Sequence, residues 1–195
     1  VCFAKAIRIM GLDSNALQYV ATNEDGQISI FALESKLKIL REQGKKCFAI
    51  VATAGTTVRG AIDPLAELGK FCSRESIWLH VDGAIGGVFA LSEMTSPLVN
   101  GISLANSITL NPQKLLGITK TSSLLLVANR STLLSTFATG LPYIEPAWGD
   151  EAHGGEIGIQ GTRSAEVLKL WLGLRQLGEN GIENLLVESI NRRSF

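Results

Sequence analysis

Three polar residues follow apolar, strand-like segments in this sequence, and their types suggest a shared chemistry. Asp82 comes directly after "IWLHV", Lys114 stands in "NPQK" after "SITL", and Thr57 lies in "AGTTVRG" after "CFAIVAT". In open α/β sheets, ligands bind beyond the carboxyl ends of the strands, so these side chains are expected to meet in one crevice. A carboxylate and a lysine together suit a pyridine cofactor, because the carboxylate keeps the ring nitrogen protonated and the lysine bonds the aldehyde as a Schiff base.

His80 precedes Asp82 by two residues in the same predicted strand. Side chains alternate between the two faces of a strand, so His80 and Asp82 are expected to face the same way. If Asp82 reaches a cofactor, His80 lies beneath or beside it, and both a direct role and a packing role remain open. A metal site is not expected here, because no third ligand is spaced to complete a zinc centre.

A cluster of three glycines, Gly83, Gly86 and Gly87, directly follows Asp82. A glycine-rich turn can cradle a phosphate, but such a turn on its own is weak evidence for one. A close approach of the backbone to a cofactor ring is the better explanation of this cluster, because glycine has no side chain to stand in the way.

Strand-like and helix-like segments alternate along the chain, which predicts an α/β fold. Expected strands cover 17–22, 47–53, 77–82, 106–110 and 121–128. Expected helices cover 1–11, 31–44, 64–76, 130–138, 164–178 and 182–193. The apolar strands favour a mostly parallel sheet flanked by helices. Residues 139–160 show little periodicity, and an irregular segment of that length usually has a functional reason.

The composition argues against several classes of protein. Lysine plus arginine equals aspartate plus glutamate, 18 against 18, so the chain has no basic field for nucleic acid. No apolar segment approaches the roughly 20 residues that a membrane-spanning helix needs, so no membrane partner is expected. The three cysteines have no metal-like spacing, and we interpret them as reduced thiols of a cytoplasmic protein.

Three longer motifs, "VATAGTTVRGAIDPL", "IWLHVDGAIGG" and "NPQKLLG", resemble the group II pyridoxal-phosphate-dependent amino acid decarboxylases. This family includes glutamate, cysteine sulfinate, diaminobutyrate and aromatic amino acid decarboxylases. The spacings are similar too, with 25 residues from Thr57 to Asp82 and 32 from Asp82 to Lys114. The resemblance runs from "KAIRIMG" to "EVLKLWLGLRQLGENGI". It implies pyridoxal 5'-phosphate as cofactor and the large domain of a fold-type I, aspartate aminotransferase-like enzyme.

The resemblance implies a role for four residues around the cofactor ring. Lys114 would form the Schiff base with the aldehyde, and Asp82 would form a salt bridge with the pyridinium nitrogen. Ala84, in "DGA", would pack on the ring face. Thr57 would hydrogen-bond near the ring hydroxyl or the substrate carboxylate.

Four further positions are assigned by the resemblance. Asn111 and Gln113 lie where the family contacts the cofactor phosphate. Tyr143 lies 29 residues beyond Lys114, where the family has a loop tyrosine that protonates the carbanion after carbon dioxide leaves. Arg163 falls on the family's arginine just before a long amphipathic helix.

The sequence departs from the family at two positions. Gln113 stands where the family usually has histidine, and glutamine can hydrogen-bond a phosphate but cannot titrate. The family also stacks a histidine on the ring five residues before a Lys-Ala pair. That pair is Lys5-Ala6 here, so the histidine would fall just before Val1. We therefore expect residues 1–195 to be part of the large domain, with its N-terminal part and the C-terminal small domain absent.

The resemblance implies decarboxylation of an L-amino acid to an amine and carbon dioxide. Acidic, aromatic and diamino acids are all handled by this family, so the substrate stays open. It also implies a homodimer with the active site near the interface. Two alternatives remain: a relative that oxidises the carbanion to an aldehyde, which Tyr143 argues against, and a truncated, non-catalytic subunit that only binds a partner chain.

Overall fold

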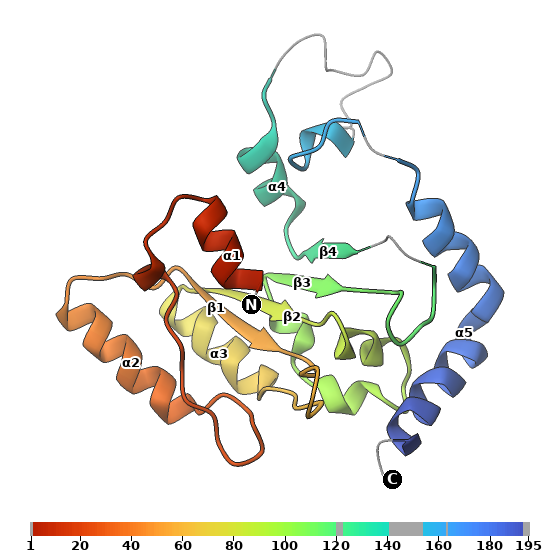
Figure 1. Cartoon of the computed structure of the whole chain (residues 1–195), viewed down its shortest axis with the longest axis horizontal. Helices are drawn as coiled ribbons and strands as arrows, with labels where there is room; N and C mark the ends of the chain where they lie inside the picture. Colours follow the sequence, from red (N-terminus) through yellow and green to blue (C-terminus); the bar gives the residue numbers. More distant parts are fainter. Residues whose placement is uncertain (1, 120–122, 141–153, 163, 193–195) are drawn as a thin grey trace. The chain divides into compact units, whose positions relative to one another are not determined.

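The computed structural model describes residues 2–119, 123–140, 154–162 and 164–192. They belong to two compact units, Val1–Cys47 and Phe48–Phe195. Tyr143 and Arg163 lie outside the described residues. Figure 1 traces the order of the elements along the chain.

The first unit contains helices α1 (Cys2–Ile9) and α2 (Ile30–Glu42) and a short 3-10 turn, η1 (Ser14–Ala16). Helix α2 begins at the N-cap Ser29, whose Oγ accepts a 3.2 Å hydrogen bond from the amide of Ala32. Leu33 and Leu37, one helical turn apart, are its buried residues. The helices expected over 1–11 and 31–44 are thus confirmed.

The strand expected over 17–22 is wrong. Only one isolated bridge, between Thr22 and Ile28, occurs in this segment. The chain turns back at once, because the Asn23 amide donates to the Gln27 carbonyl and the Gln27 amide donates to the Asn23 side chain. An extended segment without a neighbouring strand of matching length cannot build a hydrogen-bonded ladder, whatever its intrinsic preference.

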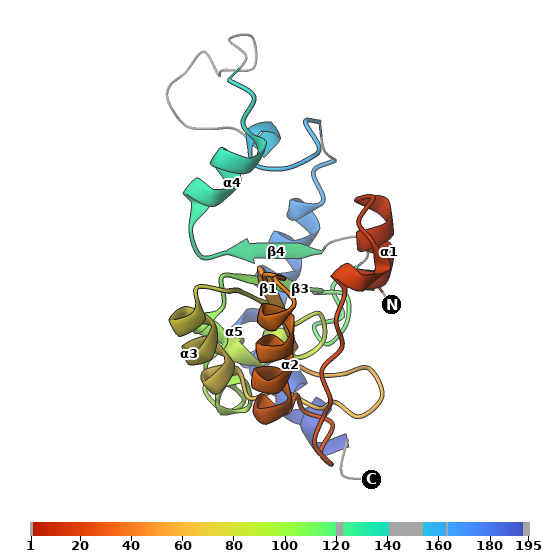
Figure 2. The ribbon, with the colours of Figure 1, turned by 90° about the vertical axis from the view of Figure 1, so that its left-hand side faces the viewer.

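The second unit is built on a four-stranded sheet of order β1-β2-β3-β4 (Figure 1). The strands are β1 (Ala49–Thr53), β2 (Trp78–Asp82), β3 (Ser107–Leu110) and β4 (Leu124–Val127). Strands β1, β2 and β3 run parallel, and β4 pairs antiparallel with β3. The predicted α/β class with a mostly parallel sheet is confirmed. Figure 2 shows β4 along one edge of this sheet, with α4 (Arg130–Phe137) following it.

The two faces of the central strands differ in burial. Ile50 and Ala52 of β1 and Leu79 and Val81 of β2 are buried on one face. This face packs against α3 (Leu65–Glu75), the crossover helix between β1 and β2. The alternate residues of β2 are only half-buried, as the burial pattern of the strand shows. The sheet therefore presents its polar residues on the face opposite α3.

Helix α5 (Val167–Asn191) replaces the two helices expected over 164–178 and 182–193. The interruption is a single residue, Gly178, whose backbone angles (φ 60°, ψ 178°) are not helical. Glycine adopts this conformation without the steric penalty that a Cβ would bring, so the chain kinks for one residue and the helix resumes. The sequence correctly predicted an interruption of the helix near Gly178, but it predicted a longer non-helical segment between the two helices.

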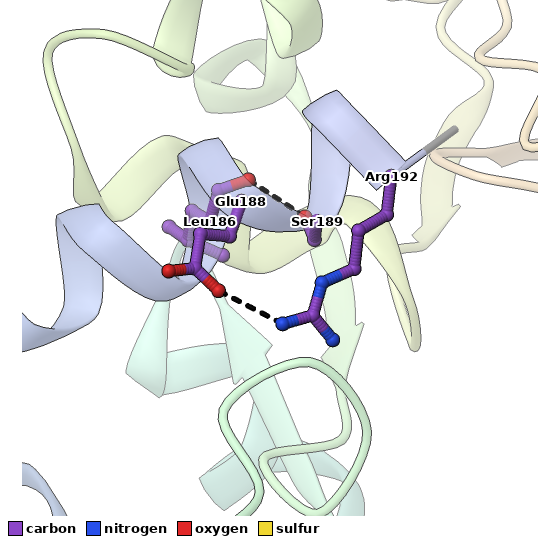
Figure 3. Close-up of polar contacts among 4 residues, drawn as sticks. All are labelled: Leu186, Glu188, Ser189 and Arg192. Atoms are coloured by element: carbon purple, nitrogen blue, oxygen red, sulfur yellow. Dashed lines mark hydrogen bonds and ion pairs between the residues drawn. The ribbon is translucent and has the colours of Figure 1, made fainter. Parts of the chain in front are cut away.

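The C-terminal half of α5 packs on one side against the elements that follow β2 and β3. Ile182 and Leu186 pack into an apolar cluster with Val88, Leu116 and Ile118. Two contacts lie within the last turns of the helix itself, drawn in Figure 3. Arg192 pairs with Glu188 at 3.0 Å, and the Ser189 hydroxyl donates to the Leu186 carbonyl at 2.7 Å. The apolar cluster contains Leu116, so α5 anchors the segment that follows β3.

Short 3-10 segments connect the larger elements of the second unit. They are η2 (Gly86–Leu91), η3 (Ser96–Val99), η4 (Ile102–Leu104) and η5 (Gly154–Glu156). No described helix is long and apolar enough to cross a membrane.

Candidate active site

Asp82 occupies the carboxyl end of the central strand β2. The strand register pairs it with Thr53 of β1 on one side and with Thr109 of β3 on the other. Its own carbonyl accepts a 2.9 Å hydrogen bond from the Ala54 amide, which continues the pairing past the end of β1. The carboxylate thus stands at the edge where ligands bind in open α/β sheets.

The Asp82 carboxylate keeps free acceptor capacity. Its Oδ1 accepts a 3.2 Å hydrogen bond from the Ala84 amide, which fixes the turn that follows the strand. Across the described ranges, no lysine, arginine or histidine forms an ion pair with it. A half-buried carboxylate without a protein cation can accept an N–H from a bound ligand as a charge-assisted hydrogen bond.

His80 lies on the same face of β2 as Asp82, as the alternation predicted. Its Nδ1 is 2.8 Å from Ser107 Oγ, and its Nε2 is 3.3 Å from Thr109 Oγ1. Burial lowers the pKa of His80 below the usual 6.5, and the nearby Asp82 charge opposes that shift only in part. The lowered pKa favours the neutral form of the His80 imidazole.

Lys114 belongs to a turn that directly follows β3. Its amide donates a 3.0 Å hydrogen bond to the Asn111 carbonyl, and its side chain is exposed. On the apolar side of the turn, Leu115 packs against the cluster that contains the buried Leu116. The backbone around the lysine is therefore fixed, while the amine remains accessible. No hydrogen bond or ion pair joins Lys114 to Asp82.

Gln113 differs from its neighbour Lys114 in burial. Its Oε1 atom is buried and has no hydrogen-bond partner among the described residues. An unpaired buried polar atom is costly, so such atoms in folded proteins call for a specific explanation. A ligand that bonds to the amide would supply one.

Thr57 is exposed in the segment that connects β1 to α3. The neighbouring Thr56 fixes this segment, because its Oγ1 accepts a 2.9 Å hydrogen bond from the Ala61 amide. The Asp63 carboxylate closes the segment by accepting a 2.6 Å bond from the Thr53 amide. Thr57 is thus carried on a structured turn just beyond the end of β1.

Two of the glycines after Asp82 lie close to the backbone of the neighbouring strands. A Cβ at Gly86 would lie 2.8 Å from the Ala54 carbonyl oxygen, and one at Gly83 would lie 3.0 Å from that of Thr109. The close approach shown by the structure is therefore to the ends of β1 and β3. These contacts press the turn against the sheet and fix the carboxyl end of β2.

The sequence analysis missed three residues that contact or fix this site, Trp78, Ser107 and Asp63. Alternation along β2 already placed Trp78 on the face of His80 and Asp82, so that signal was available. Ser107 and Asp63 act through hydrogen bonds across 27 and 10 residues of sequence, which no local pattern reveals.

A family model described as "Pyridoxal-dependent decarboxylase conserved domain" matches residues 1–193. The chain belongs to this family. It is 36% identical to the aromatic-L-amino-acid decarboxylase of Bacillus atrophaeus over 177 residues, which covers 89% of this chain and 37% of the relative. It is 34% identical to the human cysteine sulfinic acid decarboxylase over 183 residues, 92% of this chain and 37% of that one.

Solved structures of the decarboxylase family have the same fold. The crystal structure of mouse CSAD superposes with a TM-score of 0.85 at 33% identity, covering 93% of this chain and 38% of that one. The Catharanthus roseus tryptophan decarboxylase, solved with L-tryptophan, gives 0.81 at 26% identity, with coverage of 93% and 38%. The fold-type I expectation is confirmed. The chain spans less than two fifths of the length of these relatives.

The residues at the strand ends fit the pyridoxal phosphate of this decarboxylase family. Within the described residues the Asp82 carboxylate has no ion-pair partner, so it could accept from a protonated ring nitrogen, and the exposed amine of Lys114 could react with an aldehyde. Gln113 carries a side-chain amide beside Lys114, and its N–H groups can donate to a phosphate. Among the described residues no group of three or more potential ligands could hold a metal ion.

Proposed function

We propose that this chain is the central part of a pyridoxal-phosphate-dependent decarboxylase that converts an L-amino acid to its amine and carbon dioxide. The observation that carries the proposal is the Asp82 carboxylate, which stands at the end of the central strand without a protein cation among the described residues. Lys114 follows the next parallel strand, as in the motif order of the family.

Lys114 and Asp82 have the principal roles. Lys114 would hold the cofactor through its Nζ until an amino acid substrate takes its place. When bound, pyridoxal phosphate supplies the electron sink for the electron pair left behind by carbon dioxide. Asp82 keeps the ring nitrogen protonated, and the structure supports this because its carboxylate has acceptor capacity to spare.

The remaining residues position the cofactor and move a proton. Ala84 packs on the ring face, and Thr57 bonds near the ring hydroxyl or the substrate carboxylate. Asn111 and Gln113 bind the phosphate, to which the side-chain N–H groups of each amide can donate.

Three other residues complete the proposal. Tyr143, or a water that it positions, donates the proton that replaces carbon dioxide on the α-carbon. Arg163 belongs to the cofactor site by its place in the motif order. His80 lies on the same face of β2 as Asp82, where burial lowers its pKa and favours the neutral imidazole beside the cofactor.

We propose a cytoplasmic homodimer with the active site near its interface. All three cysteines are free thiols, which agrees with a reducing compartment. Trp171 and Leu172 of α5 are 57% and 58% exposed in the single chain, and apolar side chains of this size favour a covered position. Sedimentation analysis of Leu172→Asp beside the unaltered protein tests this, since a monomeric unaltered protein would exclude the homodimer.

The visible absorption spectrum with added pyridoxal phosphate tests the role of Lys114. We expect an absorption band that Lys114→Ala abolishes. Lys70→Ala is the matched control, because Lys70 is an exposed lysine of α3 and should leave the band unchanged. A band that is equally strong in Lys114→Ala would contradict the proposal.

Release of carbon dioxide from a panel of acidic, aromatic and diamino acids tests the reaction. We expect release with at least one class, and a loss of about 100-fold or more in Asp82→Asn, because charge stabilisation is usually the largest catalytic term. An aldehyde as the main product would favour the aldehyde-forming alternative over simple decarboxylation to the amine. A cofactor band without any product would favour a non-catalytic subunit.

A further inference from the structure

A line of four polar side chains lies on the face of the sheet that carries Asp82. Trp78 and His80 come from β2, and Ser107 and Thr109 come from β3. Ser107 Oγ is 2.9 Å from Trp78 Nε1 and 2.8 Å from His80 Nδ1. The register explains the contacts, because Ser107 is the direct pairing partner of His80 across the two parallel strands.

The direction of these hydrogen bonds follows from the donor inventory. An indole N–H can only donate, so the Ser107 hydroxyl accepts from Trp78. Ser107 is 6% exposed, and within the described residues its hydroxyl contacts only the two ring nitrogens of Trp78 and His80. Its single hydrogen is therefore satisfied only when it is donated to His80 Nδ1. The opposite arrangement would leave a buried hydroxyl hydrogen unpaired, which is costly.

The consequence for His80 is a fixed tautomer. A nitrogen that accepts a hydrogen bond carries no proton, so Nδ1 is the bare nitrogen of the neutral ring. The proton is then on Nε2, which faces the hydroxyl of Thr109 at 3.3 Å. The hydrogen bonds thus run in one direction, from Trp78 through Ser107 and His80 to Thr109.

We propose that Trp78 and Ser107 are positioning residues that hold His80 as the Nε2–H tautomer, so that the neighbouring Asp82 carboxylate stays available to the cofactor's ring nitrogen. The second half of this inference rests on the proposed function. An imidazolium on the same face would compete with the protonated ring for Asp82, and the hydroxyl donor at Nδ1 disfavours that cation. Burial of the ring acts in the same direction.

Nitrogen NMR of histidine-labelled protein without cofactor measures the tautomer directly. The chain has two histidines, His80 and His153, so His153→Gln assigns the signals. At about pH 8, above the usual histidine pKa, we expect a protonated Nε2 and a bare Nδ1 for His80. We expect Trp78→Phe and Ser107→Ala to shift the His80 signals toward a mixture of both tautomers.

Two matched controls separate this effect from a general loss of packing. Ser92 is also 6% exposed and also forms a side-chain hydrogen bond, to Glu183, so Ser92→Ala removes a comparable bond elsewhere. Trp171→Phe is the corresponding tryptophan control in α5. Both should leave the His80 signals unchanged. The backbone amide spectrum of each variant shows whether the fold is retained. If Ser107→Ala does not fold, Ser107→Thr is measured in its place. This variant keeps the hydroxyl, so we expect it to keep the Nε2–H tautomer of His80.

A proton on Nδ1 in the unaltered protein, or signals that do not respond to Trp78→Phe and Ser107→Ala, would overturn the inference. Its second half is tested by cofactor affinity, which should fall about tenfold in Ser107→Ala, as is typical for groups that orient a ligating residue. Unchanged affinity with an altered tautomer would overturn that half. The Lys114-dependent absorption band is measured independently of the His80 tautomer. Failure of the proposed function can therefore be distinguished from failure of the tautomer inference.

Discussion

Thr53 and Asp63 exchange two hydrogen bonds across the segment that connects β1 to α3. The Thr53 amide donates to the Asp63 carboxylate at 2.6 Å, and the Asp63 amide donates to the Thr53 carbonyl at 2.9 Å. These bonds close the ten-residue connection on itself and fix the turn that carries Thr57.

Replacement of Asp63 should loosen this connection. Asp63→Ala leaves the half-buried Thr53 amide without its acceptor, so we expect the free energy of unfolding to fall by about 1–3 kcal/mol. Asp63→Asn keeps a side-chain oxygen at the same place and should lose clearly less. Urea denaturation of the three proteins measures the difference. Equal stability of Asp63→Ala and the unaltered protein would mean that the bond contributes nothing.

His80 should make the stability of the protein depend on pH. Burial lowers the pKa of His80 in the folded state below its usual 6.5, although Asp82 opposes the shift. As pH falls through about 6.5, the unfolded chain therefore binds a proton before the folded chain does, and stability decreases. The contribution of His80 to stability is fully present above the pKa of His80 in the unfolded chain. It is lost as pH falls through the lower pKa of His80 in the folded state.

His80→Gln removes the titrating ring and should flatten the pH dependence of unfolding between about pH 7.5 and 5.5. Urea midpoints measured at both pH values for the unaltered protein, His80→Gln and His153→Gln separate the contributions of the two histidines. If His80→Gln keeps the full dependence, another group is responsible for it.

Gln113 should stabilise the protein only when a ligand is bound. Gln113→Leu removes the buried oxygen that has no partner among the described residues, so we expect stability without cofactor to stay equal or rise by about 1 kcal/mol. The increase in melting temperature on addition of pyridoxal phosphate should become smaller in Gln113→Leu. A loss of stability without cofactor, together with an unchanged response to it, would contradict a phosphate contact.

Two identical substitutions should have opposite effects on stability. Gly86→Ala places a Cβ 2.8 Å from the Ala54 carbonyl oxygen, so we expect a loss of about 1–3 kcal/mol, as for other overpacked sites. In Gly181→Ala, the new Cβ meets only an ordinary 3.5 Å contact with Leu177 inside α5. Gly181→Ala should raise the free energy of unfolding by about 0.5–1 kcal/mol, because alanine has a higher helix propensity than glycine.

Thermal unfolding of both glycine variants checks this pair of predictions. Destabilisation of both by the same amount would show that the distance to Ala54 is not the cause. The comparison also tests why a glycine is needed at position 86, where the turn after β2 packs closely against the residue that follows β1.

Local sequence patterns predicted most of the elements of the second unit and the order of its candidate site residues. Apolar runs that end at polar residues located β1, β2 and β3, with Asp82 at the end of β2 and Lys114 after β3. These signals are local, because period and turn chemistry depend on residues close in sequence. The long motifs identified the family for the same reason.

The tertiary structure alone decided the pairings. In the folded chain β4 pairs antiparallel with β3, and residues 17–22 form no strand. The register of β2 and β3 places Ser107 opposite His80. These outcomes depend on residues far apart in sequence, such as the 27 positions between His80 and Ser107, and no local pattern encodes that distance. Side-chain alternation placed His80 beside Asp82, but only the strand register gave the imidazole the partners that fix its proton.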